Sequence, residues 1–239
     1  MHWIHYKNEA KAKETGKMTE EQLAKQKANG SESEDTICTA DLTDDEILEG
    51  LNLLLIGDSI AVDVTDDFYE IFPNSVSDTK IGRITSLGKQ VLDSYIDEKK
   101  WEGEGVIFAS LSNSPINGEL EDIREKIGKD MPLFLTTVRI PHDTFEEESN
   151  SKIKKFVEEN DHTYLIDWYA ASEGHDEYFD ADDTHLLSAG AKAYAKCIKE
   201  AVLDAYKKEN IEIPKSRLVS STDTSTDSSN DSSKNASTE

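Results

Sequence analysis

Leu53-Leu54-Leu55-Ile56-Gly57-Asp58-Ser59-Ile60 joins an apolar run to a polar turn. Four consecutive apolar residues predict a short strand that is buried on both faces. After the turn, apolar residues at helical spacing continue as far as Phe72 and predict an amphipathic helix. A buried strand that passes through a short turn into a helix is typical of a parallel α/β sheet. We therefore expect Ser59 to lie at the carboxyl end of a strand.

Ser59 has the position expected of a catalytic nucleophile. Ligands of open α/β sheets bind at the carboxyl ends of the strands, where a helix N-terminus also stabilises negative charge. A serine hydroxyl needs a base, usually histidine, and a third group that orients the base. Taken alone, Gly57-Asp58-Ser59 is also compatible with an ordinary strand-to-helix turn capped by serine.

The rest of the chain repeats this alternation of strand and helix. Thr43 with Glu46 forms a capping box that predicts a short helix ahead of the first strand. We expect a three-layer α/β/α sandwich in which helices cover both faces of a five-stranded parallel sheet. The further strands are expected at 77–81, 105–111, 131–140 and 163–167, and the further helices at 83–99, 118–127, 146–159 and 188–208.

The composition changes at both ends of this pattern. Residues 1–39 are polar and rich in Lys and Glu, and we expect them to form a stalk or linker. Residues 40–212 contain the alternating pattern and predict a single catalytic domain. Residues 213–239 are dominated by Ser, Thr and Asp. Because a segment with so few apolar residues cannot bury enough surface to offset its ordering entropy, we expect it to be disordered.

The charge of the chain argues against several classes of partner. Lys and Arg together number 26 against 50 Asp and Glu, which gives a formal net charge of -24. Nucleic acid and anionic membrane surfaces would both repel such a chain. The sequence as given contains no apolar run long enough for a membrane span or an export signal, so we expect a soluble chain.

The two cysteines, Cys38 and Cys197, are too few for a disulfide framework, and their spacing suits no metal site. We expect both to be free and buried, with a single bridge between them as the alternative. No other residue pattern indicates a metal or a cofactor, so none is expected.

Six histidines are candidates for the base, and His185 has the most favourable position. It follows the last predicted strand and precedes the last helix, which places it at the same edge of the sheet as Ser59. Asp182, three residues earlier, can accept the imidazole Nδ1–H and leave Nε2 for the serine. Asp183 is the alternative orienting group, and His175 is the alternative base.

Gly57-Asp58-Ser59 near the start of the domain and Asp182-x-x-His185 near its end resemble the first and last signature motifs of SGNH (GDSL-type) hydrolases. The resemblance implies a flavodoxin-like five-stranded parallel sheet, in agreement with the alternation described above. It also implies that Ser59 is the nucleophile, that His185 is the base, and that Asp182 orients this histidine.

The same resemblance implies an oxyanion hole with three donors. These are the backbone N–H of Ser59, a backbone N–H near Gly82 and the side-chain amide of Asn113, which follows the third strand. The family pattern Gly-x-Asn-Asp reads Leu111-Ser-Asn113-Ser here, so the glycine is absent. A simple turn glycine remains the alternative explanation of Gly82.

Further motifs resemble one branch of this family, the extracytoplasmic domains of bacterial cell-surface O-acyltransferases such as the peptidoglycan O-acetyltransferases of Gram-positive bacteria. In that branch the SGNH domain follows a membrane acyltransferase domain. The given sequence contains no such domain, so we expect it to be either the excised outer part of such a protein or a shortened relative. The resemblance therefore implies an extracytoplasmic location, with such a membrane domain as a partner and residues 1–39 as a juxtamembrane stalk. The motifs lie at 78–83, 137–141, 150, 167–169 and 185–190.

The resemblance implies an enzyme that moves an acetyl group from an acyl donor ester, through acyl-Ser59, to a hydroxyl of a carbohydrate of the peptidoglycan type. One alternative is an acetyl esterase that uses water as the acceptor. A second alternative is an inactive glycan-binding module, because the third motif is altered. Trp168 is a candidate for stacking against a sugar ring, and its alternative is to pack under the loop that follows it.

Overall fold

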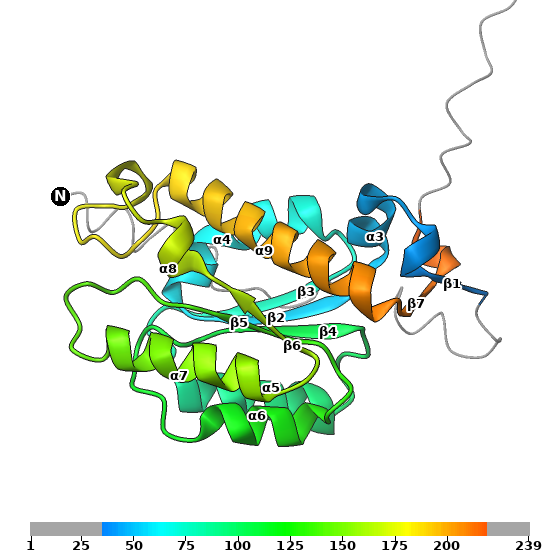
Figure 1. Ribbon diagram of the computed structural model, residues 1–239, viewed down its shortest axis with the longest axis horizontal. Helices are drawn as coiled ribbons and strands as arrows, with labels where there is room; N and C mark the ends of the chain where they lie inside the picture. Colours follow the sequence, from blue (N-terminus) through cyan, green and yellow to red (C-terminus); the bar gives the residue numbers. More distant parts are fainter. Residues whose placement is uncertain (1–34, 219–239) are drawn as a thin grey trace, which may run out of the picture.

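A parallel sheet of five strands forms the centre of the computed structural model, which describes residues 35–218 (Figure 1). All four neighbouring pairs of strands are parallel, and the spatial order is β3-β2-β4-β5-β6. The predicted fold class is therefore confirmed. The strands are β2 (Leu53–Gly57), β3 (Val76–Thr79), β4 (Gly105–Ala109), β5 (Leu133–Thr136) and β6 (Thr163–Ile166).

Helices cover both faces of this sheet (Figure 1). One face carries α4 (Ser59–Ile71) and the long α9 (Ser188–Glu209), together with the shorter α3 (Asp44–Gly50) and α8 (Trp168–Ala171). The opposite face carries α5 (Thr85–Asp97), α6 (Glu119–Ile127) and α7 (Glu146–Glu159). Short 3₁₀ turns lie at η1 (Thr39–Asp41), η2 (Asp176–Tyr178) and η3 (Lys215–Arg217).

The first strand of the sheet, β2, supplies both halves of the hydrophobic core. Leu53 and Leu55 pack with α4 and α9, whereas Leu54 and Ile56 pack with the helices on the other face. All four side chains are fully buried. The alternation arises because successive side chains of a strand point to opposite faces of its sheet. The apolar run therefore determines a central position for β2, between β3 and β4.

Several element boundaries differ from the predicted ones by one or two residues, and those of the strand predicted at 131–140 differ most. The strand predicted at 131–140 spans only Leu133–Thr136. The Thr137 N–H still donates to the Ile166 carbonyl of β6 at 3.0 Å, but the Val138 backbone then bonds to the Asn150 side chain. A separate antiparallel pair, β1 (Thr36–Cys38) and β7 (Glu212–Pro214), extends the folded region on both sides of 40–212. Residues 1–34 and 219–239, which contain most of the predicted stalk and tail, lie outside the described residues.

Local predictions of other kinds are also tested by the structure. The capping box at the start of α3 is confirmed, since Thr43 Oγ1 accepts from the Glu46 backbone and the Glu46 carboxylate accepts from the Thr43 backbone. Cys38 and Cys197 are both free, as predicted, but each is only partly buried. Burial raises the pKa of the Cys197 thiol to about 11, so this thiol is not activated as a nucleophile at neutral pH.

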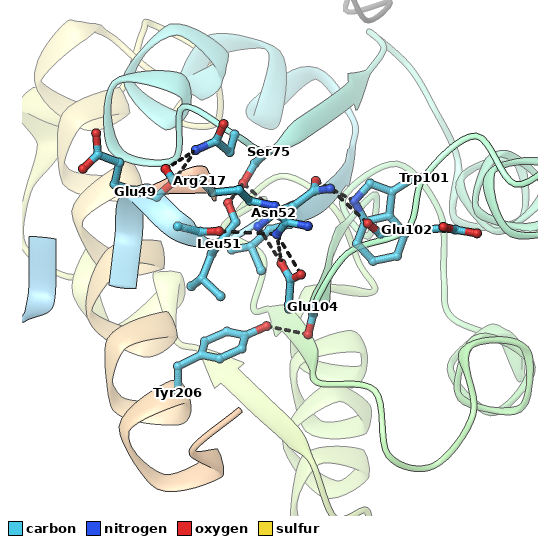
Figure 2. A network of polar contacts seen from close by, with 12 residues as sticks. Glu49, Leu51, Asn52, Ser75, Trp101, Glu102, Glu104, Tyr206 and Arg217 are labelled. Atoms are coloured by element: carbon cyan, nitrogen blue, oxygen red, sulfur yellow. Dashed lines mark hydrogen bonds and ion pairs between the residues drawn. The ribbon is translucent and has the colours of Figure 1, made fainter. Parts of the chain in front are cut away.

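A partly buried polar network holds the end of the described chain against the amino end of the sheet. Figure 2 shows Glu104 between Asn52 and Arg217: its carboxylate accepts from the Asn52 backbone N–H at 2.8 Å and from the Arg217 guanidinium at 2.7 and 2.8 Å. The Tyr206 hydroxyl of α9 donates to the Glu104 backbone carbonyl at 2.7 Å. Because this network lies at the edge opposite to Ser59, its role is structural.

The Glu104–Arg217 pair predicts a pH-dependent loss of stability in Arg217→Met. Burial raises the pKa of Glu104 above its ordinary value of 4.5, while Arg217 acts against this rise. Without Arg217 the buried carboxylate has no cationic partner in this network, and we expect a loss of about 3 kcal/mol at pH 7. As the pH falls, a carboxyl whose pKa is raised in the folded state is protonated in the folded protein before it is protonated in the unfolded chain. The stability lost in Arg217→Met should therefore be smaller at pH 5 than at pH 7. Urea unfolding at both pH values measures this difference.

Lys215→Met is the matched control, because Lys215 pairs with Asp35 on the exposed surface and should contribute less than about 1 kcal/mol. The double variant Glu104→Gln/Arg217→Met should recover part of the loss at pH 7. An equal loss for Arg217→Met at pH 7 and pH 5 would show that the arginine acts through packing and not through charge.

Candidate active site

Ser59 is the first residue of α4 and follows β2 directly, at the carboxyl edge of the sheet. The preceding residue, Asp58, caps the helix, since its carboxylate accepts from the Ile60 backbone N–H at 3.1 Å. Ser59 is 6% exposed. The N-terminal backbone N–H groups and the helix dipole favour negative charge at this point. The structure thus places Ser59 in the environment that the sequence predicts for the nucleophile.

Asp182 and His185 are in direct contact. The Nδ1 atom of His185 lies 2.6 Å from Asp182 Oδ2, and Asp182 Oδ1 accepts from the backbone N–H of His185 at 2.9 Å and of Thr184 at 3.1 Å. Burial acts to raise the pKa of Asp182, but the hydrogen bonds from His185 and Thr184, together with the charge of His185, hold that pKa below its ordinary value. Asp182 is therefore ionised at neutral pH and orients the imidazole, with Nδ1 as the donor.

The loop that carries His185 is hydrogen-bonded to α4, the helix that begins with Ser59. The backbone N–H of Leu186 donates to the carboxylate of Asp63 at 3.0 Å. Asp63 lies four residues after Ser59, and residues at this spacing share one face of a helix. The Asp182–His185 pair is therefore held on the same side of α4 as Ser59.

The alternative groups considered from the sequence have other partners. Asp183, whose φ is +56°, lies 3.1 Å from the Nε2 atom of His142. His175 lies 2.8 Å from Glu177 and its ring stacks on Tyr178. Asp182 is thus the carboxylate that contacts His185, and Asp183 faces the loop after β5.

Asn113 lies in the loop that follows β4 and is connected to Asp58. The fully buried Asp58 accepts from Ser112 twice, from its backbone N–H at 3.0 Å and from its hydroxyl at 2.6 Å. The Asn113 side-chain amide donates to the same Ser112 hydroxyl at 3.3 Å. Burial raises the pKa of Asp58, although the bonds from Ser112 act in the opposite direction. Asp58, the residue before Ser59, therefore also positions the loop that carries Asn113.

Gly82 lies in the turn between β3 and α5. Its φ is +71°, a conformation that strongly favours glycine, and a Cβ atom there would meet nothing within 4 Å. The backbone conformation thus explains the glycine, as the turn interpretation expects. The next residue, Arg83, is buried and donates to the Gly57 backbone carbonyl at 3.0 Å and to Asp78. Gly82 is thereby kept close to the turn that precedes Ser59.

Two serines after β4 connect the loops of Asn113 and Gly82. The Ser110 hydroxyl donates to the Arg83 backbone carbonyl at 3.2 Å, and Ser114 Oγ accepts from the Thr85 backbone N–H at 3.1 Å. Ser114 is one of the residues that differ from the family pattern, and it serves here as the acceptor at the start of α5. The altered motif therefore still forms an ordered loop.

Trp168 does not offer a face to a sugar. It is 2% exposed and packs against Tyr178, Phe179 and Tyr194, with ring centroids 5.0 to 6.0 Å apart. The sugar-stacking interpretation of Trp168 is therefore wrong, and the packing alternative is correct. The physical reason is that α8 turns this large apolar ring toward the core, while the next residue, Tyr169, remains 36% exposed.

The chain is similar to known proteins in both sequence and fold. The chain is 34% identical over 146 residues to the O-acetyltransferase OatA of Staphylococcus aureus (strain NCTC 8325 / PS 47), a match that covers 61% of the chain and 24% of OatA. Its structure resembles the C-terminal catalytic domain of the peptidoglycan O-acetyltransferase OatA of Streptococcus pneumoniae, with a TM-score of 0.60, 20% identity, and coverage of 70% of this chain and 99% of that domain.

A GDSL-like lipase from Bacteroides thetaiotaomicron matches with a TM-score of 0.54 and 15% identity, over 70% of this chain and 94% of the lipase. This chain has the SGNH hydrolase fold and resembles OatA. It spans about a quarter of the length of the curated OatA that it matches. No protein-family model matches the chain.

Within this SGNH fold, the structure adds two positioning residues that the sequence analysis missed. Asp63 holds the loop of His185, and Ser112 connects Asp58 with Asn113. The spacing of Asp63 from Ser59 is visible in the sequence, since residues four apart share a helix face. Its partner, the backbone of Leu186, is 123 residues away and has no sequence signal.

Asn113→Ala tests whether the side-chain amide donates to an oxyanion. We expect kcat for a small aryl acetate to fall by about 10²-fold with a smaller change in KM, because an oxyanion donor acts mainly in the transition state. Steady-state kinetics measure both constants. The control is Asn117→Ala, an exposed amide on the same loop. An unchanged kcat in Asn113→Ala would leave the oxyanion to backbone groups alone.

Proposed function

We propose that this domain transfers an acetyl group, through an acyl-Ser59 intermediate, from an ester donor to a hydroxyl of a cell-wall glycan. The observation that carries this proposal is the contact between Asp182 and His185 on a loop that bonds to the helix beginning with Ser59. The acetyl group and the peptidoglycan acceptor are proposed from the similarity to OatA.

The proposed reaction has two symmetrical halves. His185 accepts the Ser59 proton as the hydroxyl oxygen attacks the acetyl carbonyl, and Asp182 stabilises the imidazolium that forms. The backbone N–H of Ser59, a backbone N–H near Gly82 and the Asn113 amide stabilise the oxyanion, after which His185 returns the proton to the leaving alcohol. A glycan hydroxyl then attacks the acyl-enzyme with His185 as its base, which releases the acetylated glycan and restores Ser59.

Exposed apolar side chains support substrate binding at this edge of the sheet. Among residues 35–218, every large apolar residue classed as exposed follows the carboxyl end of a strand or flanks His185. Apolar groups concentrated at one edge are typical of binding surfaces. The residues are Ile81, Ile84, Leu87, Tyr169 and Leu187.

The proposal includes a source for the acetyl group. No helix within residues 35–218 has the length and apolar character needed to cross a bilayer. On the family resemblance, we propose that a membrane acyltransferase domain delivers acetyl groups to this domain, and that the domain works outside the cytoplasm.

The test of the proposed function uses the full chain with an activated acetyl ester and soluble peptidoglycan oligomers, and analyses both protein and glycan by mass spectrometry. We expect an acetyl adduct on Ser59 and acetylated glycan, and we expect neither product with Ser59→Ala. Free acetate without acetylated glycan would make the domain an esterase. Glycan binding without any acetyl adduct or acetate would make it an inactive binding module.

A further inference from the structure

Arg139 differs from the other three arginines of the chain in the partners of its guanidinium. Arg83 and Arg217 form ion pairs with Asp78 and Glu104, and Arg124 donates to backbone carbonyls and to Thr163. Within residues 35–218, Arg139 contacts two aromatic rings and has neither an ion pair nor a hydrogen bond from its guanidinium.

The position of Arg139 is close to the candidate active site. Its guanidinium lies over the rings of Tyr169 and Phe179, 5.4 and 5.8 Å from their centroids. Phe179 forms a β-bridge with Leu186, and the adjacent Asp180 N–H donates to the His185 carbonyl at 2.8 Å. One aromatic ring therefore separates Arg139 from the backbone that carries the base.

The loop that presents Arg139 is held firmly. Asn150 of α7 bonds to both backbone groups of Val138, accepting from its N–H at 2.8 Å and donating to its carbonyl at 2.9 Å. The Ile140 N–H donates to the Glu146 carboxylate on the other side of Arg139. Because both neighbours are fixed, the backbone position of Arg139 beside the two rings is set by the fold.

We propose that Arg139 binds a carboxylate of the acceptor glycan and thereby selects anionic over neutral acceptors. A guanidinium that stacks on aromatic rings uses its faces and leaves its in-plane N–H groups available. Two of these N–H groups can donate parallel hydrogen bonds to the two oxygens of a carboxylate. A single carboxylate suits the site better than a phosphate dianion, because the acidic loop at Asp180 and Asp183 repels higher charge. The acceptor identity rests on the proposed function.

The test measures binding, so that it does not depend on turnover. In the full chain with Ser59→Ala, calorimetry compares a peptidoglycan disaccharide fragment that has a free carboxylate with its methyl ester. We expect the free acid to bind about 10-fold more tightly or better, and we expect Arg139→Met to remove this preference, since a hydrogen-bonded ion pair is lost. Arg139→Lys should keep part of it. Lys208→Met, which removes the same charge at the far end of α9, should keep all of it.

Each other outcome overturns the proposal. Equal affinities for acid and ester in the parent protein, or no binding of either at millimolar concentration, would show that Arg139 is not an anion site. A full preference that persists in Arg139→Met would assign the carboxylate to another group. Acetyl transfer to Ser59 in the wild-type chain is measured separately, so the failure of this inference and the failure of the proposed function are distinguished.

Discussion

Ser59→Ala is expected to lower the turnover of a small aryl acetate by roughly 10³-fold or more, while the protein remains folded. The nucleophile is lost outright, and the Asp182–His185 pair alone has no hydroxyl to activate. The substitution removes one oxygen atom from the first residue of α4, where Asp58 continues to provide the helix cap. The helix should therefore keep its stability.

The measurement compares initial rates and thermal unfolding of Ser59→Ala with those of Ser151→Ala, an exposed serine on α7. The control should match the wild-type chain in both properties. Wild-type rates in a clean Ser59→Ala preparation would refute the acyl-serine mechanism and, with it, the proposed function. An unfolded Ser59→Ala protein would instead contradict the claim that Asp58 is sufficient as the cap.

Asp182→Asn is expected to lower kcat by about 10³-fold, whereas Asp183→Asn should change it by less than about threefold. Asparagine can present an N–H to the imidazole and so favour the wrong tautomer, with Nδ1 as the acceptor. The structure predicts the large difference between neighbours, since Asp182 contacts His185 and Asp183 contacts His142. Both variants change the charge equally, which makes each the control for the other.

Steady-state kinetics over a range of pH give a second check on Asp182. Hydrogen bonds from His185 keep the Asp182 pKa below its ordinary value of 3.8, so this carboxylate is ionised above that pH. A fall in kcat/KM between pH 7 and pH 5 must then report protonation of a group other than Asp182. A larger loss in Asp183→Asn than in Asp182→Asn would reverse the assignment of the orienting carboxylate.

Much of the fold and the candidate residues could be predicted from the sequence because their signals are local. The apolar run at 53–56 predicted a buried strand, and periodic apolar residues predicted the helices that cover the sheet. The contact of Asp182 with His185 is also local, since three residues separate them and a tight loop brings them together. The catalytic roles of Ser59, Asp182 and His185 stay predictions until the variants are measured.

The tertiary structure decided the features that depend on residues far apart in the chain. Trp168 is buried because aromatic residues from a loop and from α9 surround it, which its own neighbourhood in the sequence does not reveal. The distinction between Asp182 and Asp183 depends on His142, 41 residues away. Arg139 lies in the motif at 137–141, but the motif does not reveal what its guanidinium contacts. Only the fold shows that its guanidinium lies over the Phe179 ring without a carboxylate partner among the described residues. The reason is that contacts between residues far apart in the chain depend on how the chain folds and not on their separation in the sequence.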